Sequence, residues 1–493
     1  MTLSLMAANK LPINDLSGGL NKDFPPHLIN PNQLAVADNI VYRSGKWTMR
    51  GGYSHPYSTT ASGFEVLEIA DYLRNDGTSK LYLADKKDIY ELSGTSWVSR
   101  LALGTARAVT DKWWFAEINN TIYATNGVDT IKFATTGSFA AITWDTSTDA
   151  ASVTGIQVTR AKIILALNSR LWMFNTTDSL DGSIPIKALW TEVEDYDRVN
   201  PANQMLFDDS QSPILSAGVL SNNFIAVYKQ DQVVVIQNTG NPVTSVRFRF
   251  PNGILATKAW TRIPGGHFFI GQDGFYTFSG ATPSAIGDNN VTSHFFSILS
   301  QADQGNLYCW TDWFHREIHI HIPTDSGIPS RQLIYNWQYN TWSESDLTGW
   351  CGMYRFRSLN TATRLYGGQS GNIRLEGAES GGSTDNGVTI LTKLRTKAMV
   401  NMPDSKTLKA TDYIQANRIT TDALPTSTII KAGIADFGVE APTFDSTATI
   451  TATDGFAPYA DIEPATGRYI SIEAEGFETV SEFQMEWESA GEN

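Results

Sequence analysis

The stretch NNFIAVYKQDQVVVIQNTGNPVTSVRFRF (residues 222–250) carries the pattern from which the fold is predicted. Its apolar, β-branched run at 233–236 is short and has the composition of a buried strand. The polar residues 229–232 separate this run from a second apolar run, so the two are expected to form a hairpin. A single hairpin cannot bury its own apolar faces, and it therefore has to pack against other sheets.

Similar hairpins recur along most of the chain. Asn126-Gly127 and Asp273-Gly274 are dipeptides typical of tight turns between antiparallel strands, and apolar strands such as LYLAD (81–85) and LWMFN (171–175) hold equivalent places in their units. Units that begin roughly every 40 to 50 residues are the mark of a radial array. We therefore predict an all-β chain with a β-propeller of six or seven blades, in which 233–237 is an inner strand buried on both faces. A large β-sandwich or a pair of stacked sheets is the alternative.

Changes in sequence texture divide the chain into three parts. Residues 1–55 are expected to form an extended arm, a short helix and a hairpin, and residues 56–387 the propeller. The Gly- and Ser-rich segment EGAESGGSTDNG (376–387) marks the next boundary. Residues 388–493 show the period-2 alternation of strands, and they predict a C-terminal β-domain or strands that return to close the propeller.

The N-terminal arm has its own local signals. Asn30, Pro31 and Gln33 have the spacing of a capping box, which predicts a short helix over 34–38. Residues 40–43 and 46–49 predict a hairpin that turns at Ser44-Gly45. Elsewhere helical periodicity is nearly absent, and 293–302 is the best remaining helix candidate.

Composition narrows the classes of function. The chain of 493 residues has a net charge of −14, which argues against a protein that grips nucleic acid through its phosphates. The same charge suits a wall past which DNA slides without sticking. No apolar run approaches the ~20 residues of a membrane span, and no basic segment precedes the short apolar N-terminus, so we expect neither a membrane anchor nor a signal peptide. Cys309 and Cys351 are expected to be buried free thiols in a reducing cytoplasm.

The sequence offers little for chemistry. His315, His319 and His321 share one side of a predicted strand and are weak candidates for a metal site, with a solvated strand face as the alternative. Phosphate-binding loops, nucleophile elbows and zinc-protease helices are absent, and so is the repeated aspartate turn of sialidases. We therefore expect no enzyme, no catalytic residue and no cofactor.

Two other features invite functional hypotheses. The longest insertion between strands (194–211) contains Asp195, Asp197, Asp208 and Asp209, which form either a surface loop or a loop that reaches a channel or a partner. The aromatic segments DKWWF (111–115) and NWQYNTW (336–342) suit a hydrophobic core or a platform for stacking sugars.

The arm, DLSGGLNKDFPPHLINPNQLAVADNIVYRSGKWTMRGGY (15–53), resembles the opening of many bacteriophage virion proteins. Their pattern is a Gly-Gly-Leu-Asn lead, a Pro-rich link, an Ala-x-Asn helix end and a Gly-x-x-x-Arg-x-Gly hairpin. The interval from Gly45 to Arg50 is one residue longer here. The matching positions are Gly18, Gly19, Leu20, Asn21, Ala37, Asn39, Gly45, Arg50 and Gly52. Within this arm, the segment expected to take part in assembly comprises Asn21, Pro25, Pro26, Asn30 and Arg50.

Followed by a propeller and a terminal β-domain, this arm is similar to that of the tail nozzle or hub proteins of short-tailed phages, the tail tubular protein B-like family of podoviruses. The resemblance implies a structural virion protein, assembled in the host cytoplasm, that forms a homo-oligomeric ring, with a hexamer favoured. It also implies contacts with the portal and the adaptor (head-tail connector), attachment of fibres or spikes, and passage of double-stranded DNA without tight binding. A carbohydrate- or receptor-binding tail propeller is the alternative, with a glycan hydrolase as the third possibility.

Overall fold

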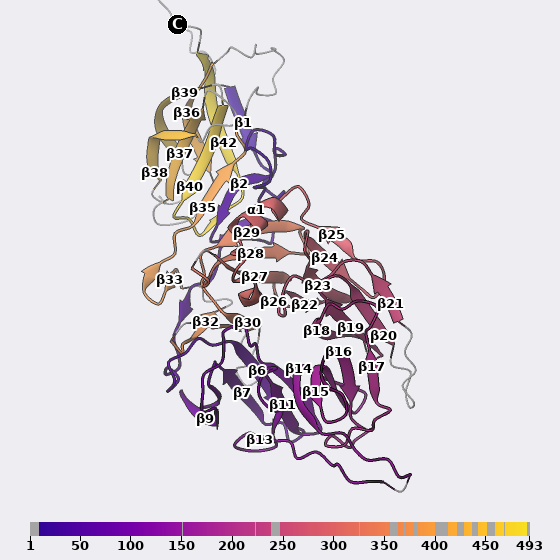
Figure 1. The fold of residues 1–493 in the computed structure, drawn as a ribbon. Helices are drawn as coiled ribbons and strands as arrows, with labels where there is room; N and C mark the ends of the chain where they lie inside the picture. Colours follow the sequence, from indigo (N-terminus) through magenta and orange to yellow (C-terminus); the bar gives the residue numbers. More distant parts are fainter. Residues whose placement is uncertain are drawn as a thin grey trace, which may run out of the picture.

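The protein is nearly all β in the computed structural model, whose strands form two groups (Figure 1). The structure describes residues 9–149, 151–221, 223–237, 247–324, 326–354, 363–368, 370–377, 382–399, 413–421, 428–435, 442–450, 459–467 and 469–490. The larger group is a β-propeller, which confirms the predicted fold class. Within these residues no helix is long and apolar enough to cross a membrane.

In the described part of the chain the propeller has seven blades of four antiparallel strands each. Six blades are separate four-stranded sheets, and blade 6 is the first four strands of a nine-stranded sheet. Blade 1 contains β6 (Glu68–Leu73), β7 (Ser79–Ala84), β8 (Asp88–Ser93) and β9 (Ser96–Ala102). Blade 2 contains β10 (Trp114–Ile118), β11 (Thr121–Thr125), β12 (Lys132–Ala134) and β13 (Ala140–Ala141). Blade 3 contains β14 (Val158–Leu167), β15 (Arg170–Asp178), β16 (Gly182–Trp190) and β17 (Gln204–Leu206). Blade 4 contains β18 (Ile214–Ser221), β19 (Phe224–Lys229), β20 (Val233–Gln237) and β21 (Arg247–Phe250). Blade 5 contains β22 (Trp260–Ile263), β23 (Gly266–Ile270), β24 (Phe275–Phe278) and β25 (Ser284–Ile286).

Blades 6 and 7 complete the ring. Blade 6 contains β26 (Tyr308–Asp312), β27 (Glu317–Pro323), β28 (Pro329–Asn336) and β29 (Thr341–Ser345). Blade 7 contains β30 (Cys351–Tyr354), β31 (Thr363–Gly367), β32 (Ile373–Gly377) and β5 (Tyr53–Ser54). The fourth strand of blade 7 thus comes from the N-terminal arm, and it pairs with β32 through Leu375 opposite Ser54. Because β30 contacts both β26 and β6, the last blade lies against the first and the propeller is closed.

The first strand of each blade lies nearest the axis, since contacts between successive blades run mainly through β6, β10, β14, β18, β22, β26 and β30. This ordering corrects the expectation for 233–237. The segment is β20, the third strand of blade 4, hydrogen-bonded to β19 and β21 rather than lining the axis. Residues 233–236 are buried on both faces as expected, because a middle strand is covered by the neighbouring blades. Burial alone therefore does not reveal the radial position of a strand.

The second group of strands lies beyond blade 6 (Figure 1). One sheet has the order β1-β42-β36-β39: β1 (Asn9–Ile13), β42 (Phe483–Ala490), β36 (Tyr413–Thr421) and β39 (Tyr459–Gly467). The other contains β35 (Lys393–Thr396), β40 (Tyr469–Glu475), β37 (Thr428–Ala435) and β38 (Thr443–Ile450). Strand β2 (Leu34–Asp38) joins the second of these sheets to blade 6, because it pairs with β35 on one side and with β29 on the other.

The expected helix over 34–38 is wrong, because these residues form β2. One of the two capping-box hydrogen bonds forms, from the Asn30 N–H to Gln33 Oε1, whereas the Gln33 N–H donates to the Asn30 carbonyl and not to the Asn30 side chain. The chain then extends because strands from both groups pair with LAVAD, burying residues 34–37. Pairing to distant strands outweighs the local signal.

The other local expectations agree more closely with the structure. The arm hairpin forms as β3 (Ile40–Arg43) and β4 (Lys46–Met49), with Ser44 and Gly45 at positive φ, and β41 (Thr479–Val480) pairs with β4. Helix α1 spans Thr292–Ile298, shorter than the expected 293–302, and a 3-10 turn, η1, spans Gln304–Asn306. A small hairpin, β33 (Thr384–Asp385) and β34 (Val388–Thr389), links the two groups of strands. Cys309 and Cys351 are both buried free thiols.

Candidate functional site

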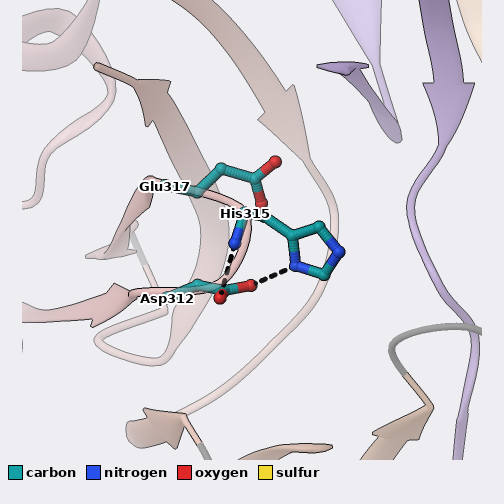
Figure 2. A group of neighbouring side chains, drawn as sticks. All are labelled: Asp312, His315 and Glu317. Carbon is teal, nitrogen blue, oxygen red and sulfur yellow. Dashed lines mark hydrogen bonds and ion pairs between the residues drawn. The ribbon is translucent and has the colours of Figure 1, made fainter. Parts of the chain in front are cut away.

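A buried group of charged side chains lies at the β26–β27 turn of blade 6 (Figure 2). Asp312 ends β26 and Glu317 begins β27, so the hairpin register places them opposite each other. His315 lies in the turn between them, with its Nδ1 2.7 Å from Asp312 Oδ2. Ligand atoms of the three residues lie within 4.8 Å of one another, as they would in a metal site.

Two arginines from other parts of the chain complete this cluster. Arg364 of β31 lies 2.6 Å from Asp312 and 3.0 Å from Glu317, and its side chain is 1% exposed. Arg43 of the arm hairpin binds both oxygens of Glu317 in a bidentate pair at 2.7 Å. The cluster thus connects blade 6, blade 7 and the N-terminal arm, and we call these five residues the charged joint.

The charges within the joint are matched. Burial opposes ionisation of Asp312, but Arg364 and His315 outweigh it and hold the pKa of this carboxyl below its ordinary value. Burial likewise opposes ionisation of Glu317, and Arg43 and Arg364 lower the pKa of its carboxyl well below the usual range. Two carboxylates therefore face two guanidinium groups. A divalent cation would have to displace a buried arginine, so the residues fit a structural ion-pair network better than a metal site.

The three histidines that sequence analysis grouped as weak metal candidates do not form one ligand set. His315 binds Asp312 in the turn, whereas His319 stacks on Trp310 with ring centres 4.3 Å apart. His321 accepts a hydrogen bond from Trp310 Nε1 at 2.9 Å, and burial lowers the pKa of His321 to about 3. His319 and His321 thus belong to the aromatic packing of blade 6, which also contradicts the expected solvated strand face because both are buried.

A second buried charged group fills the centre of the propeller. Glu68 of blade 1 and Lys258, which precedes β22 of blade 5, form an ion pair at 2.8 Å. The Lys258 ammonium lies 3.9 Å from the ring centre of Trp114 in blade 2, and the Tyr308 hydroxyl of blade 6 donates to Glu68 at 2.8 Å. Side chains from four blades meet only at the axis, so this group closes the propeller's own central hole.

The acidic residues of the 194–211 insertion lie on two sides of blade 3. Asp195 and Asp197 line a pocket with Tyr123 and Phe133 of blade 2. Burial raises the pKa of Asp195, and its hydrogen bond to Asp197 raises it further. Asp208 is exposed beyond β17, where Asp209 lies 2.9 Å from Arg249 of blade 4. The four carboxylates therefore do not form one site.

The arm residues expected to take part in assembly divide into two sets. Asn21 and Arg50 are buried and bind their own chain: Asn21 Nδ2 donates to the Asn289 carbonyl, and Arg50 pairs with Asp346 and Asp385. The segment with Pro25, Pro26 and Asn30 lies nearer the surface, flanked by the exposed side chains of Phe24 and Leu28. Only the second set is accessible to a neighbouring molecule.

The aromatic segments do not form the platform considered for sugars. Trp113, Trp114 and Trp342 are at most 8% exposed and belong to the cores between blades. The Trp113 Nε1 donates to the Asp85 carbonyl, and Trp342 packs on Phe275. These three tryptophans serve the hydrophobic core, whereas Trp337 and Tyr339 of the second segment are half-buried.

No family model matches this chain, and no curated protein matches it. Among solved structures it is similar to PorZ, an essential bacterial surface component of the type-IX secretion system of Porphyromonas gingivalis, at 10% identity and a TM-score of 0.38, covering 75% of this chain and 45% of that chain. It is also similar to Saccharomyces cerevisiae Sqt1, at 6% identity and a TM-score of 0.38, covering 66% of this chain and 98% of that chain. The chain thus spans less than half of PorZ, and neither likeness carries an argument about function.

Proposed function

We propose that this chain is a structural subunit of the tail nozzle or hub of a short-tailed bacteriophage. The observation that carries the proposal is the place of the arm residues shared with virion proteins. Arg50 is 3% exposed, pairs with Asp346 and Asp385, and donates to Asn39 Oδ1 at 2.9 Å. Asn39, at a positive φ of 57°, donates in turn to the Leu391 carbonyl. The shared residues thus fasten the arm to the propeller and to the segment that leads into the C-terminal strands.

The shared glycines are equally constrained. A Cβ on Gly52 would lie 2.2 Å from the Thr384 carbonyl oxygen, and one on Gly19 would lie 2.8 Å from the backbone nitrogen of Trp342. Any larger residue would force the backbones apart at both places. The resemblance therefore rests on residues whose chemistry this architecture requires, which supports a common architecture with those virion proteins.

The filled axis bears on how DNA would pass. Glu68, Lys258, Trp114 and Tyr308 leave no straight path through one propeller, so a DNA channel would have to be enclosed by several copies around a shared axis. A homohexamer, as the resemblance implies, meets this requirement. The net charge of −14 would limit sticking of DNA to the channel wall.

The remaining parts of the proposal concern partners. The subunit would contact the portal and adaptor complex and carry fibres or spikes, and it would be assembled in the host cytoplasm. The exposed Phe24 and Leu28, beside Pro25 and Pro26, are the arm side chains that suit contact with a neighbouring subunit. The carbohydrate-binding alternative loses the aromatic platform on which it relied.

The proposal is tested by measuring the mass of the purified full chain alone and with the portal and adaptor proteins. Six copies of the 54.2 kDa chain would give a ring of about 325 kDa, visible by negative-stain microscopy as a six-fold particle. A chain that stays monomeric alone and also fails to join the portal and adaptor would refute the proposal. A Phe24→Ser, Leu28→Ser double variant should keep its fold and lose ring formation.

A further inference from the structure

The turn between β26 and β27 (residues 313–316) leaves two large aromatic side chains in solvent. Trp313 is 48% exposed and Phe314 is 56% exposed. The turn is held in place, because Asp312 Oδ1 accepts hydrogen bonds from the N–H groups of Phe314 and His315 at 2.9 and 3.1 Å. Exposed aromatic side chains on a fixed turn are typical of a contact surface. We call residues 313–316 the aromatic turn.

The aromatic turn is flanked by positive charge that has no partner. Arg316 of the turn and Arg262 of β22 are both exposed, and neither guanidinium group forms an ion pair within the described part of the chain. Arg262 and Trp313 line the same cavity, and no aspartate or glutamate is among the described residues that line it. Arginine beside exposed aromatic rings is the composition that protein interfaces favour at their centres.

A pocket of opposite charge lies between blades 2 and 3, with a volume of about 510 Å³. Three acidic and three aromatic residues line it: Glu194, Asp195, Asp197, Tyr123, Phe133 and Tyr196. No lysine or arginine is among the described residues of its wall. The acidic residues come from the loop after β16, which is fixed by a hydrogen bond of 2.9 Å from the Glu194 N–H to the Ser169 carbonyl. We call this site the acidic pocket.

The carboxylates of the acidic pocket lack a matching cation. Arg198 follows them in the sequence, but it pairs with Asp145 at 2.8 Å and with Asp149 at 3.3 Å, and neither of these residues lines the pocket. Burial raises the pKa of the Asp195 carboxyl, and the hydrogen bond to Asp197 raises it further. Such a shift is expected where like charges are held together. The acidic pocket therefore suits a cationic group supplied from outside.

The aromatic turn and the acidic pocket lie on opposite sides of the propeller. Figure 1 shows β26 and β27 on one side and β11 and β13, whose residues line the pocket, on the other. The two surfaces therefore do not meet within one chain. One offers guanidinium groups beside aromatic rings, and the other offers carboxylates beside aromatic rings. A contact between two different surfaces of identical chains repeats head to tail, and it forms a ring when the rotation closes.

We propose that the aromatic turn of one copy of this chain docks into the acidic pocket of the next copy. Arg316 pairs with the carboxylates of the pocket, and Trp313 and Phe314 pack against its aromatic rings. The inference rests on the proposed function, because it identifies a contact within the ring proposed there. This contact adds to the one proposed for Phe24 and Leu28.

Charge reversal tests this contact through the mass of the full chain, measured by size-exclusion chromatography with light scattering. Arg316→Glu and Asp197→Arg should each raise the dissociation constant of the ring about tenfold or more, because each variant places like charges in the contact. An equimolar mixture of the two variants should recover the ring. In the mixture each intact turn meets an intact pocket, and the two reversed charges meet each other.

Two further variants keep the test specific to these surfaces. Phe314→Ser leaves the charges unchanged and should also weaken the ring, because it removes an exposed aromatic side chain from the contact. Lys87→Glu reverses the charge of an exposed lysine of blade 1 outside both surfaces, and it should leave the mass unchanged. Melting temperatures equal to that of the wild-type protein show that each variant is folded.

The outcomes separate this contact from the proposed function. A ring that persists in Arg316→Glu, Asp197→Arg and Phe314→Ser would overturn the contact and leave the proposed function standing. Loss of the ring in both charge variants without recovery in their mixture would overturn the pairing of these two surfaces. If the wild-type chain forms its ring only with the portal and adaptor proteins, the same masses are compared in that complex. A wild-type chain that forms no ring in either case would overturn both proposals.

Discussion

The charged joint and Lys112, which precedes the first strand of blade 2, both bury basic groups, but only in the joint are these groups hydrogen-bonded to acids. Arg364 and Arg43 meet Asp312 and Glu317 at 3.0 Å or less, whereas Lys112 has no hydrogen-bond partner in the described part of the chain. A buried basic group with its partners in place holds elements together. Removal of one partner leaves the remaining charges buried and uncompensated. A buried basic group without a hydrogen-bond partner weakens the fold. The same substitution should therefore have opposite effects in the two regions.

The largest expected effect is at the joint. Arg364→Met leaves Asp312 and Glu317 buried with Arg43 as the one remaining guanidinium group of the joint, and it should lower the free energy of unfolding by about 3–5 kcal/mol. Urea denaturation followed by tryptophan fluorescence measures the change. Restoring the charge balance with Asp312→Asn in the same chain should recover part of the loss. Equal stability of wild type and Arg364→Met would remove the contrast between the regions.

At Lys112 the corresponding change to methionine should stabilise the protein. Lys112→Met keeps the packing against Trp350 and removes an unpaired buried charge, so it should raise the free energy of unfolding at pH 7 by roughly 1–3 kcal/mol. The gain should shrink with rising pH. The folded-state pKa of Lys112, about 8, lies below the ordinary lysine value of 10.5, so the wild-type protein gains stability as pH rises between these values, while the variant does not.

A pH series of denaturation curves from 7 to 10, run in parallel on wild type and Lys112→Met, measures this difference. A destabilised variant at pH 7, or a difference independent of pH, would show that Lys112 is compensated within the chain itself.

Acidification should weaken the joint. The folded-state pKa values of Asp312 and Glu317 are depressed, so their contribution is complete above the ordinary carboxyl range and is lost as pH falls through the folded values. Wild-type stability should therefore fall from about pH 4 downward, and more steeply than that of an Asp312→Asn variant. Thermal unfolding between pH 2 and 6 compares the two proteins. Parallel curves would mean that Asp312 contributes no pH-dependent stability.

Packing of the N-terminal arm can be separated from charge with a glycine pair. Gly52→Ala places a methyl group against the Thr384 carbonyl and should cost about 1–3 kcal/mol. Gly104→Ala is the matched control, because nothing lies within 4 Å of its Cβ position, and its effect should stay within about 0.5 kcal/mol. Melting temperatures of the two variants report the difference, and similar values for both would contradict the close approach at Gly52.

Sequence signals were reliable where they are local. Asn126-Gly127 and Ser44-Gly45 turn as expected, and recurring hairpins predicted the propeller. The helix prediction for 34–38 was wrong because the strands that pair with this segment, β29 and β35, lie more than three hundred residues away in the sequence. Large separation along the sequence is also the reason why the buried charged groups could not be predicted. Nothing near Glu317 in the sequence points to Arg43 or Arg364, and nothing near Lys112 points to Trp350, whose ring centre lies 5.4 Å from its Nζ.

The pairing of β5 with β32 has a consequence for how the protein is made. Residues 53–54 leave the ribosome about 320 residues before their partner strand, so a nascent chain holds six blades and an unpaired arm strand until β32 emerges. Once β32 has emerged, its open edge can pair with the arm of its own chain or with the arm of a neighbouring chain. At high local concentration two nascent chains can exchange arms, and the product is an intertwined dimer with both propellers closed in trans. Slow translation at low expression favours closure within one chain.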